Sequence, residues 1–501
     1  MSFDTFAQPP LDRLIADAAA APRLTVLLGA GASIEAGLPS WPALIERLLV
    51  RVGIESGLLE ETDETGRRRW VAEAVRRDGY LGAAAIVDAL SDHDTLEAWI
   101  PQALYGEGRS AAEFFPGPIC RQLPRLIDAF GAGFELMTTN YDDLAEQGLR
   151  DDPLQPRVAV PYVGEHREVP RGAVQVVHLH GYAGRDGRAG RLVLSESDYQ
   201  RMQQGMPWQE ARVRTALGQG MFVFVGTSLA DPNLIRYLYG DVGAATPPRY
   251  AIFVRQDSYE RKVPAGVPAA REKAIAARWA AVGVTAVFVD HYVDVAQLLY
   301  EVARAKQLED NYLPLPERAR TWVDAVERQL LGIGDDDAFV RAQLVVGARL
   351  RSALESAVAA AEELEGRRWQ EKLALTLWLI DANAAHLINR VTTDRVHIDQ
   401  ETVEPVAIDE HARWVAVRSF CRGLPLAETR DIYASRWHFI RGTPLVIDSD
   451  RHGRIPVGCL TTASMKGREE TMLNAMDDIV EARFNQALTT NVLALLDQPF
   501  R

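Results

Sequence analysis

The sequence predicts an α/β protein that begins with a doubly wound parallel sheet and ends with an α+β domain. Two observations predict the sheet. Short apolar or β-branched runs recur between residues 24 and 289, and a segment with a helical pattern follows each of them. The runs are apolar throughout, which is typical of central parallel strands covered by helices on both faces. They begin at Leu24, Phe134, Val174, Met221, Tyr250 and Thr285.

The segments between these runs complete the alternation of strand and helix, which we expect to end near Lys306. Between Gly66 and Gln122 no strand pattern appears, so this segment is predicted to be a helical insertion. The helices of the alternation are expected to begin near Trp41, Asp142, Ser197, Asp231, Glu272 and Asp294.

The length of 501 residues indicates more than one domain, because single hydrophobic cores rarely grow past about 250 to 300 residues. A polar, proline-containing stretch, QLEDNYLPLPER from Gln307, has the composition of an interdomain connection. We therefore predict a first domain over residues 1–306, a linker over residues 307–318 and a second domain over residues 319–501.

The second domain has a mixed pattern. Residues 319–390 are predicted to form long helices. PLVIDSDRHGRIPVGCLTTAS, from Pro444, predicts two strands joined by a polar turn around Asp448 to Gly453, and the segment from Glu470 is helical again. These elements predict an α+β domain.

The composition excludes several classes of protein. Hydrophobic residues make up 47% and charged residues 25% of the chain, which is the balance of a soluble globular protein. The net charge of −14, from 55 basic and 69 acidic residues, disfavours nucleic acid as a partner. No apolar segment approaches the roughly 20 residues that span a membrane. The three cysteines, Cys120, Cys421 and Cys459, lie far apart, so we expect a reducing, cytoplasmic location.

The first motif is GAGASIEAGLPSW, from Gly29 to Trp41, directly after a predicted strand. Gly29 and Gly31 permit positive φ angles and leave no side chain between the backbone and a pyrophosphate. The helix that follows would offer free N–H groups to the phosphates. The motif therefore predicts a Rossmann-like dinucleotide site. The alternative is a tight glycine turn that serves only packing.

The second motif is TTNYDD, which begins at Thr138 and follows the strand from Phe134. Ligands of open parallel sheets bind outside the carboxyl ends of the strands, where Asn140 and Asp142 are expected to lie. The Asn140 amide can hold a water or a ribose hydroxyl, and Asp142 can accept from a carboxamide. An Asn–Asp pair at a strand end is also a common helix cap.

The third motif is VVHLHGY, in which His178 and His180 are expected on one face of a strand that ends at Gly181. His180 would then lie beside the same crevice. The alternatives are part of a metal site, for which no third ligand is found nearby, and a buried histidine held by a hydrogen bond.

The fourth motif is VGTSLADPNL, from Val225, where a strand ends in a glycine turn. After Gly226, the hydroxyls of Thr227 and Ser228 could bond phosphate or ribose oxygens. For Asp231 we favour the role of helix N-cap, because Pro232 follows at the first helical position.

The order and spacing of these four motifs resemble the sirtuin family, and more closely its bacterial branch of NAD-consuming proteins of antiviral defence systems. The resemblance covers about Leu24 to Val289. It implies that Asn140 and His180 are catalytic, His180 as the base that contacts the ribose hydroxyls. It implies that NAD is bound by Gly29, Ala30, Gly31, Ser33, Trp41, Asp142, Gly226, Thr227 and Ser228.

Two departures from sirtuin deacylases favour plain hydrolysis of NAD. The chain cannot build their four-cysteine zinc ribbon, so no metal is expected, and Pro42 follows Trp41 where deacylases usually carry an arginine. The resemblance therefore implies an NAD glycohydrolase that depletes NAD in antiphage defence. A non-catalytic module that binds NAD or ADP-ribose, and a protein deacylase, are the alternatives. A nuclease is disfavoured by the charge and by the absence of clustered carboxylates.

Constant NAD hydrolysis would be toxic, so we expect the second domain, or a homo-oligomeric assembly, to regulate the first. The segment from Ser435 to Ser464 resembles a GAF-type sensing domain. The resemblance implies a small-molecule or protein activator. An α+β module that serves only oligomerisation is the alternative, since a fold alone does not fix a function.

Overall fold

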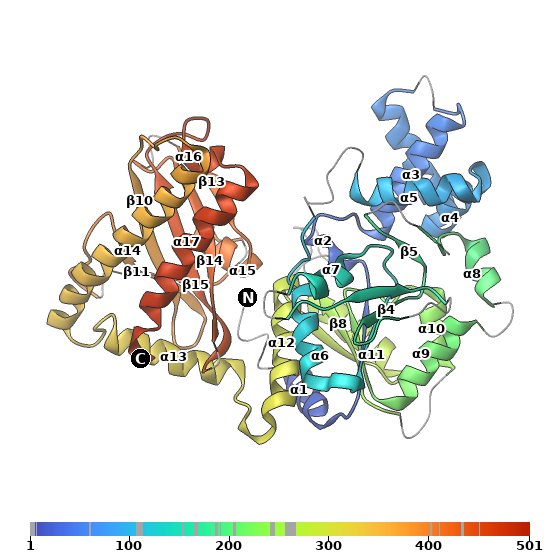
Figure 1. Ribbon diagram of the computed structural model, residues 1–501, viewed down its shortest axis with the longest axis horizontal. Coiled ribbons are helices and arrows are strands. Elements are labelled where there is room, and N and C mark those ends of the chain that lie inside the picture. The colour runs from blue at the N-terminus through green and yellow to red at the C-terminus, as the bar shows by residue number, and fades with distance from the viewer. Residues whose placement is uncertain are drawn as a thin grey trace. The chain divides into compact units, whose positions relative to one another are not determined.

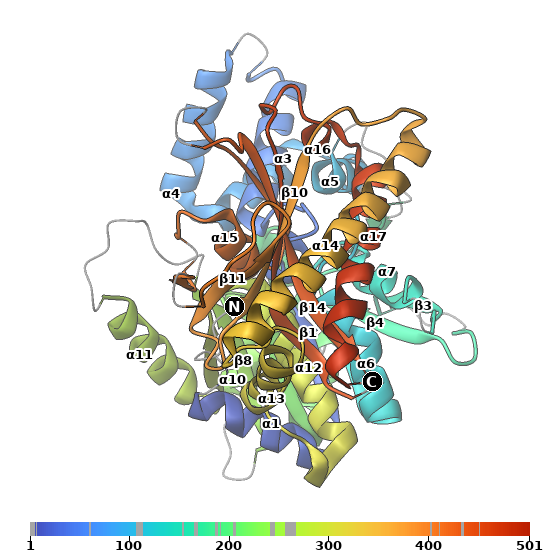
Figure 2. The same cartoon turned by 90° about the vertical axis from the view of Figure 1, so that its left-hand side faces the viewer.

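The computed structural model divides the chain into two compact units, Pro9–Tyr312 and the remainder, which are described separately (Figures 1 and 2). The residues that the structure describes are 6, 8–59, 62–106, 114–152, 155–164, 169–185, 189–190, 192–203, 207–240, 246–255, 267–400, 403–409, 411–431, 435–449 and 451–500.

The first unit contains a seven-stranded parallel sheet, which confirms the predicted α/β class. Every strand of this sheet except β3 was predicted from the sequence. β3 has four residues, includes Pro161 and lies at the sheet edge, where proline is tolerated. The strands are β1 (Leu24–Leu28), β2 (Phe134–Thr138), β3 (Ala159–Tyr162), β4 (Val174–His178), β7 (Met221–Val225), β8 (Arg249–Val254) and β9 (Thr285–Val289).

Helices cover both faces of this sheet, as the uninterrupted apolar strands require (Figure 1). One face carries α1 (Pro9–Ala20), α6 (Leu123–Phe130) and α12 (Tyr292–Leu308). The other carries α9 (Trp208–Gln219), α10 (Pro232–Tyr239) and α11 (Val267–Ala280). On this second face the strand residues Phe222 and Phe224 pack against Leu217, Leu238 and other fully buried side chains.

The predicted helical insertion is confirmed over its described residues; residues 107–113 lie outside them. It consists of α4 (Glu64–Leu90) and α5 (His93–Tyr105), and α4 bends at Gly79, which has a φ of +66°. The helix predicted to begin near Trp41 is α3 (Trp41–Glu55). Shorter elements are α2 (Gly31–Ile34), α7 (Leu144–Arg150), α8 (Glu196–Gln203) and the small hairpin of β5 (Tyr182–Ala183) and β6 (Ala189–Gly190).

The strand order explains where a ligand crevice should form. The sheet runs β3-β4-β2-β1-β7-β8-β9. When β3 is set aside, the remaining strands follow the Rossmann order 3-2-1-4-5-6. The chain therefore reverses direction across the sheet between β1 and β7, and ligands of such sheets bind at that switch point, outside the carboxyl ends of the strands.

The second unit is an α+β domain, as predicted, but its helical segment is shorter than expected. The helices α13 (Leu315–Gln329) and α14 (Asp336–Glu365) precede a six-stranded antiparallel sheet in the order β12-β11-β10-β15-β14-β13. The strands are β10 (Leu373–Ile380), β11 (His386–Thr392), β12 (Pro405–Ala407), β13 (Leu426–Thr429), β14 (Phe439–Ser449) and β15 (Gly453–Ser464). The remaining helices are α15 (Val415–Arg422), α16 (Met472–Ala475) and α17 (Asp478–Leu496).

The prediction of helix over residues 373–390 was wrong, because β10 and most of β11 occupy this range. LALTLWLI is an apolar run without alternation, and such a run cannot be told from a buried helix by its period. The strand pair predicted from Pro444 is confirmed as β14 and β15, although Asp450 in its turn lies outside the described residues. The helices α15 and α17 pack on opposite faces of this sheet. Of two consecutive residues of β14, Gly442 approaches Ser419 of α15 and Thr443 bonds Asn485 of α17.

The predicted linker is largely ordered. Residues 307–308 complete α12, and α13 begins at Leu315, after Pro314. The chain divides between Tyr312 and Leu313. Among the helices that the structure describes, none is both long and apolar enough to cross a bilayer.

Candidate functional site

The loops that follow β1 and β7 touch each other at the switch point. The Gly29 N–H donates to the Val225 carbonyl and the Gly31 N–H donates to the Gly226 carbonyl, both at 2.8 Å. A β-carbon on Gly29 would lie 2.7 Å from the Gly226 oxygen, and one on Gly226 would lie 2.5 Å from the Ala32 nitrogen. Glycine is therefore required here because two backbones approach closely.

This contact corrects two expectations about the first motif. Of its two leading glycines and Gly226, only Gly226 has a positive φ, of +65°. The helix α2 has four residues, and the N–H groups of Gly31, Ala32 and Ser33 donate to carbonyls of the two loops. These N–H groups are not free for phosphate in this conformation. Thr227 is half-buried and Ser228 is exposed, and each hydroxyl oxygen accepts the backbone N–H two residues on. Each hydroxyl can still donate its hydrogen to a ligand.

Asn140 joins the second motif to the first. Its side-chain Nδ2 donates to the Gly29 carbonyl at 3.0 Å and to Ser33 Oγ at 3.1 Å, and the Ser33 hydroxyl donates to Asp142 Oδ2 at 2.9 Å. The other Asp142 oxygen accepts from the N–H of Leu144, the first residue of α7, while Asp143 occupies the N-cap position. Burial raises the pKa of Asp142 to about 6.

The two histidines of the third motif separate, because β4 ends at His178 and not at Gly181. His178 is fully buried and its ring contacts the Asn140 carbonyl at 3.0 Å and Glu146 Oε1 at 2.8 Å. The Asn140 carbonyl can only accept, so Nδ1 carries hydrogen. A second hydrogen on Nε2, directed at an ionised Glu146, makes the ring an imidazolium. Burial opposes this charge, but the Glu146 carboxylate raises the pKa of His178 above its ordinary value.

His180 lies past the end of β4 and contacts the fourth motif. Its Nε2 is 3.1 Å from Asp231 Oδ2, which also accepts from the Tyr199 hydroxyl at 2.7 Å. The predicted N-cap role of Asp231 is confirmed, since its Oδ1 accepts from Leu234 N at 2.8 Å. Among the described residues no three His, Cys, Asp or Glu side chains gather around a possible metal position.

Hydrogen bonds join Trp41 and the segment after β4 to the second and third motifs. The indole of Trp41 hydrogen-bonds the hydroxyl of Tyr141, which donates to the Val193 carbonyl at 2.6 Å. The Val193 N–H in turn donates to the His180 carbonyl. No hydrogen bond joins the side chains of Asn140 and His180, which are 8% and 7% exposed. The structure thus brings residues of all four motifs to one sheet edge, in a closed arrangement.

Two acidic residues next to the glycine loops were not predicted. Glu35 follows α2, and Asp294 lies in the first turn of α12, where it accepts from His291 N. Each has a buried carboxylate oxygen without a hydrogen-bond partner. Burial, and then the charge of Asp294, raise the pKa of Glu35 to about 7. Single acidic residues in a helix or loop carry no sequence signal that distinguishes them from surface residues.

We expect Glu35→Gln to stabilise the protein at alkaline pH. The folded protein holds the Glu35 proton more tightly than the unfolded chain, so stability falls as pH rises from 4.5 to about 7. The amide removes this loss and raises the free energy of unfolding by about 2 kcal/mol at pH 8. Urea denaturation of Glu35→Gln and the parent protein at pH 5 and pH 8 measures this change in stability. Glu196→Gln, at an exposed position, is the control. An equal effect at both pH values would contradict the assignment.

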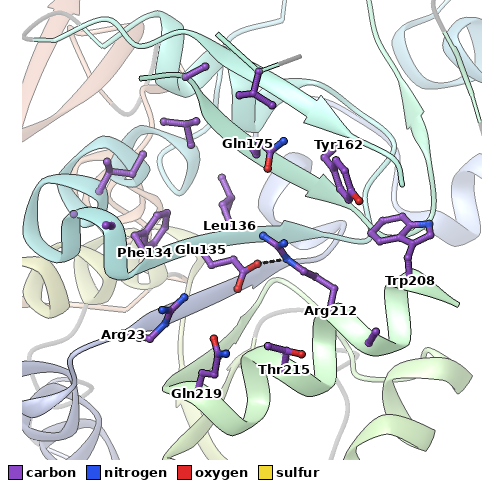
Figure 3. Close-up of a pocket in the computed structure, with 17 residues that line it drawn as sticks. Arg23, Phe134, Glu135, Leu136, Tyr162, Gln175, Trp208, Arg212, Thr215 and Gln219 are labelled. Atoms are coloured by element: carbon purple, nitrogen blue, oxygen red, sulfur yellow. Dashed lines mark hydrogen bonds and ion pairs between the residues drawn. The ribbon is translucent and has the colours of Figure 1, made fainter. Parts of the chain in front are cut away.

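A cavity of about 720 Å³ lies at the opposite edge of the sheet, where the strands begin (Figure 3). Figure 3 shows the ion pair of Arg212 and Glu135 at its centre. None of the predicted site residues lines it. Because open parallel sheets bind ligands at the carboxyl ends of their strands, we assign the candidate site to the glycine loops and not to this cavity.

One known protein family matches the part of the chain that contains three of the four motifs. Residues 135–285 match the family described as the SIR2-like domain. The SIR2-like segment begins in β2 and ends in β9, and it contains Asn140, His180 and Gly226. The first motif, from Gly29 to Trp41, precedes it, but the contacts above join that motif to the segment.

Other comparisons are more distant. No curated protein matches the sequence. A solved structure described as a Sir2 homologue in complex with NAD has 14% sequence identity and a TM-score of 0.26, over 59% of this chain and 94% of its own. A likeness at this score supports no detail of the site.

Proposed function

We propose that the first unit binds NAD and hydrolyses it to nicotinamide and ADP-ribose. The observation that carries this proposal is the convergence of the four motifs at the β1–β7 switch point, where Asn140 bonds Gly29 and His180 bonds Asp231. The SIR2-like match over residues 135–285 supports an NAD-using enzyme.

The proposed chemistry uses only positioned side chains. The bond between the ribose anomeric carbon and nicotinamide breaks, and the electron pair leaves with nicotinamide, which departs as a neutral base. A water oxygen bonds the same carbon and loses its proton. Asn140 would orient this water, and His180 would bond the ribose hydroxyls and accept the proton, a role worth about 10² to 10⁴ in rate.

The glycine loops would hold the rest of the dinucleotide. Gly29, Ala30, Gly31 and Gly226 offer backbone without side chains larger than methyl, and Thr227 and Ser228 offer hydroxyls. Ser33 and Asp142 would turn from each other toward the nicotinamide ribose and carboxamide. The N–H groups now bonded between the loops would become phosphate donors if the loops part on binding.

The closed arrangement supports a regulated enzyme. Asn140 and His180 are almost wholly buried, so NAD requires an opening of the chain around them, which includes the contacts of Trp41 and Val193 with Tyr141. We propose that the second unit, or a homo-oligomeric assembly, controls this opening, and that the protein is an NAD-depleting effector of antiphage defence. The six-stranded sheet with helices α15 and α17 packed on β14 is consistent with a GAF-like sensing role.

Incubation of the full chain with NAD, with and without cyclic nucleotides and related small signals, tests the proposal. We expect release of nicotinamide and ADP-ribose in equal amounts, increased by at least one of the added signals. Binding of NAD without nicotinamide release would favour the non-catalytic module. Release that requires an acylated peptide and yields acyl-ADP-ribose would favour a deacylase.

A further inference from the structure

Asp231 does more than cap α10, because it also contacts the side chains of His180 and Tyr199. A cap uses one carboxylate oxygen, and Asp231 Oδ1 serves that role toward Leu234 N. The second oxygen, Oδ2, accepts from the Tyr199 hydroxyl at 2.7 Å and lies 3.1 Å from His180 Nε2. The ring of Tyr199 also packs edge-on against the imidazole, with centroids 5.6 Å apart. The histidine is therefore held by a half-buried carboxylate and an aromatic ring.

Charge fixes the direction of these hydrogen bonds. Burial alone would raise the pKa of Asp231, but the charge of His180, the backbone of Leu234 and the Tyr199 hydroxyl hold it below its ordinary value. Asp231 is therefore an anion at neutral pH, and it can only accept hydrogen bonds. The Nε2 atom of His180 must carry a hydrogen, whether the ring is neutral or charged.

We propose that Asp231 and Tyr199 are positioning residues that make His180 Nδ1 the base of the reaction. With Nε2–H fixed on Asp231, the neutral ring has its lone pair on Nδ1, which makes no hydrogen bond with the described residues. The proton released by the attacking water moves to Nδ1, and the Asp231 carboxylate stabilises the imidazolium that forms. This inference rests on the proposed function.

Asp231→Asn tests the charge while it preserves the cap and the side-chain volume, since asparagine caps helices as well as aspartate does. We expect kcat for NAD hydrolysis to fall by about 10² to 10³ while KM changes less than about threefold. Loss of the anion removes the partner that stabilises the imidazolium, so the acid limb of the kcat–pH profile moves to lower pH. Asp63→Asn, which changes the N-cap of α4, is the matched control and should leave kcat unchanged.

Tyr199→Phe is a second variant, and it should shift the acid limb of the kcat–pH profile in the opposite direction. Without the tyrosine hydroxyl, Asp231 is a stronger acceptor, so the acid limb moves to higher pH while kcat falls by about twofold to tenfold. If both residues had only structural roles, the two variants would not shift the kcat–pH profile in opposite directions. Unchanged profiles in both variants would overturn the inference.

Nitrogen NMR of the full chain labelled at histidine separates this inference from the proposed function. We expect the neutral His180 ring to carry its hydrogen on Nε2 in the parent protein and to lose this preference in Asp231→Asn. If the parent protein cleaves no NAD, the proposed function fails, and the NMR result still decides whether Asp231 fixes the tautomer. A hydrogen on Nδ1 in the parent would overturn the inference even if NAD is cleaved.

Discussion

Replacement of Asn140 or His180 by alanine is expected to reduce NAD hydrolysis by at least 10² while the protein stays folded. Each of these side chains makes only a small number of hydrogen bonds with the described residues. Removal of the Asn140 amide leaves the Gly29 carbonyl without that donor, at a cost of about 1 to 3 kcal/mol. The loss of activity should therefore exceed any loss attributable to unfolding. Nicotinamide release at saturating NAD, with circular dichroism of each variant, measures both quantities.

Gln175→Ala provides the matched control for the Asn140 variant. Gln175 also carries an amide on a strand of the same sheet, but it lines the cavity at the opposite edge (Figure 3). We expect it to retain the activity of the parent protein. Full activity in a folded Asn140→Ala or His180→Ala variant would remove the basis of the proposed mechanism.

The largest loss of stability is expected from breaking the ion pair between His178 and Glu146. Both side chains are fully buried, and the ring also donates to the Asn140 carbonyl. His178→Ala leaves the Glu146 carboxylate buried without its cation, which lowers the free energy of unfolding by about 3 to 5 kcal/mol. The double variant His178→Leu with Glu146→Leu removes both charges and should lose less stability than His178→Ala. Urea denaturation of both variants and the parent gives the comparison.

The same pair predicts a dependence of stability on pH. The pKa of His178 is raised above 6.5 in the folded protein, so the pair stabilises the fold fully below that pH. This contribution is lost as pH rises through the raised pKa, and the double leucine variant should not show the loss. His386→Ala, which breaks the half-exposed pair with Asp381, is the control and should change stability by less than about 1 kcal/mol. If His178→Ala behaves like His386→Ala, the imidazolium assignment is wrong.

The strands of the first unit were predictable because their signal is local. Each is a short, continuously apolar run bounded by glycine or polar residues, and burial on both faces of a parallel sheet requires that pattern. The edge strand β3 lacked the signal because it pairs with β4 alone and all four of its residues are only half-buried. In the second unit, β10 gave an equally apolar run, but no glycine or proline turn bounded it, and the helical pattern before it favoured a longer helix.

The site followed a similar division. The motifs around Gly29, Asn140 and Gly226 were predicted to meet because parallel strands end at one edge of a sheet, and the structure places them in contact. The sequence also identified Asp231 as a cap. It did not reveal the second acceptor role of Asp231 or the contribution of Tyr199, which is 32 residues away in the chain.

By itself, the sequence determined the α/β class, six of the seven strands of the parallel sheet and the order of motifs that indicates an NAD site, because these depend on residues adjacent in the chain. Only the tertiary structure decided that His178 is buried against Glu146, that His180 is held by Asp231 and that the glycines serve a contact between two loops. The protonation of a histidine depends on the acceptors that surround it in space. Those acceptors come from elements whose packing no local pattern encodes.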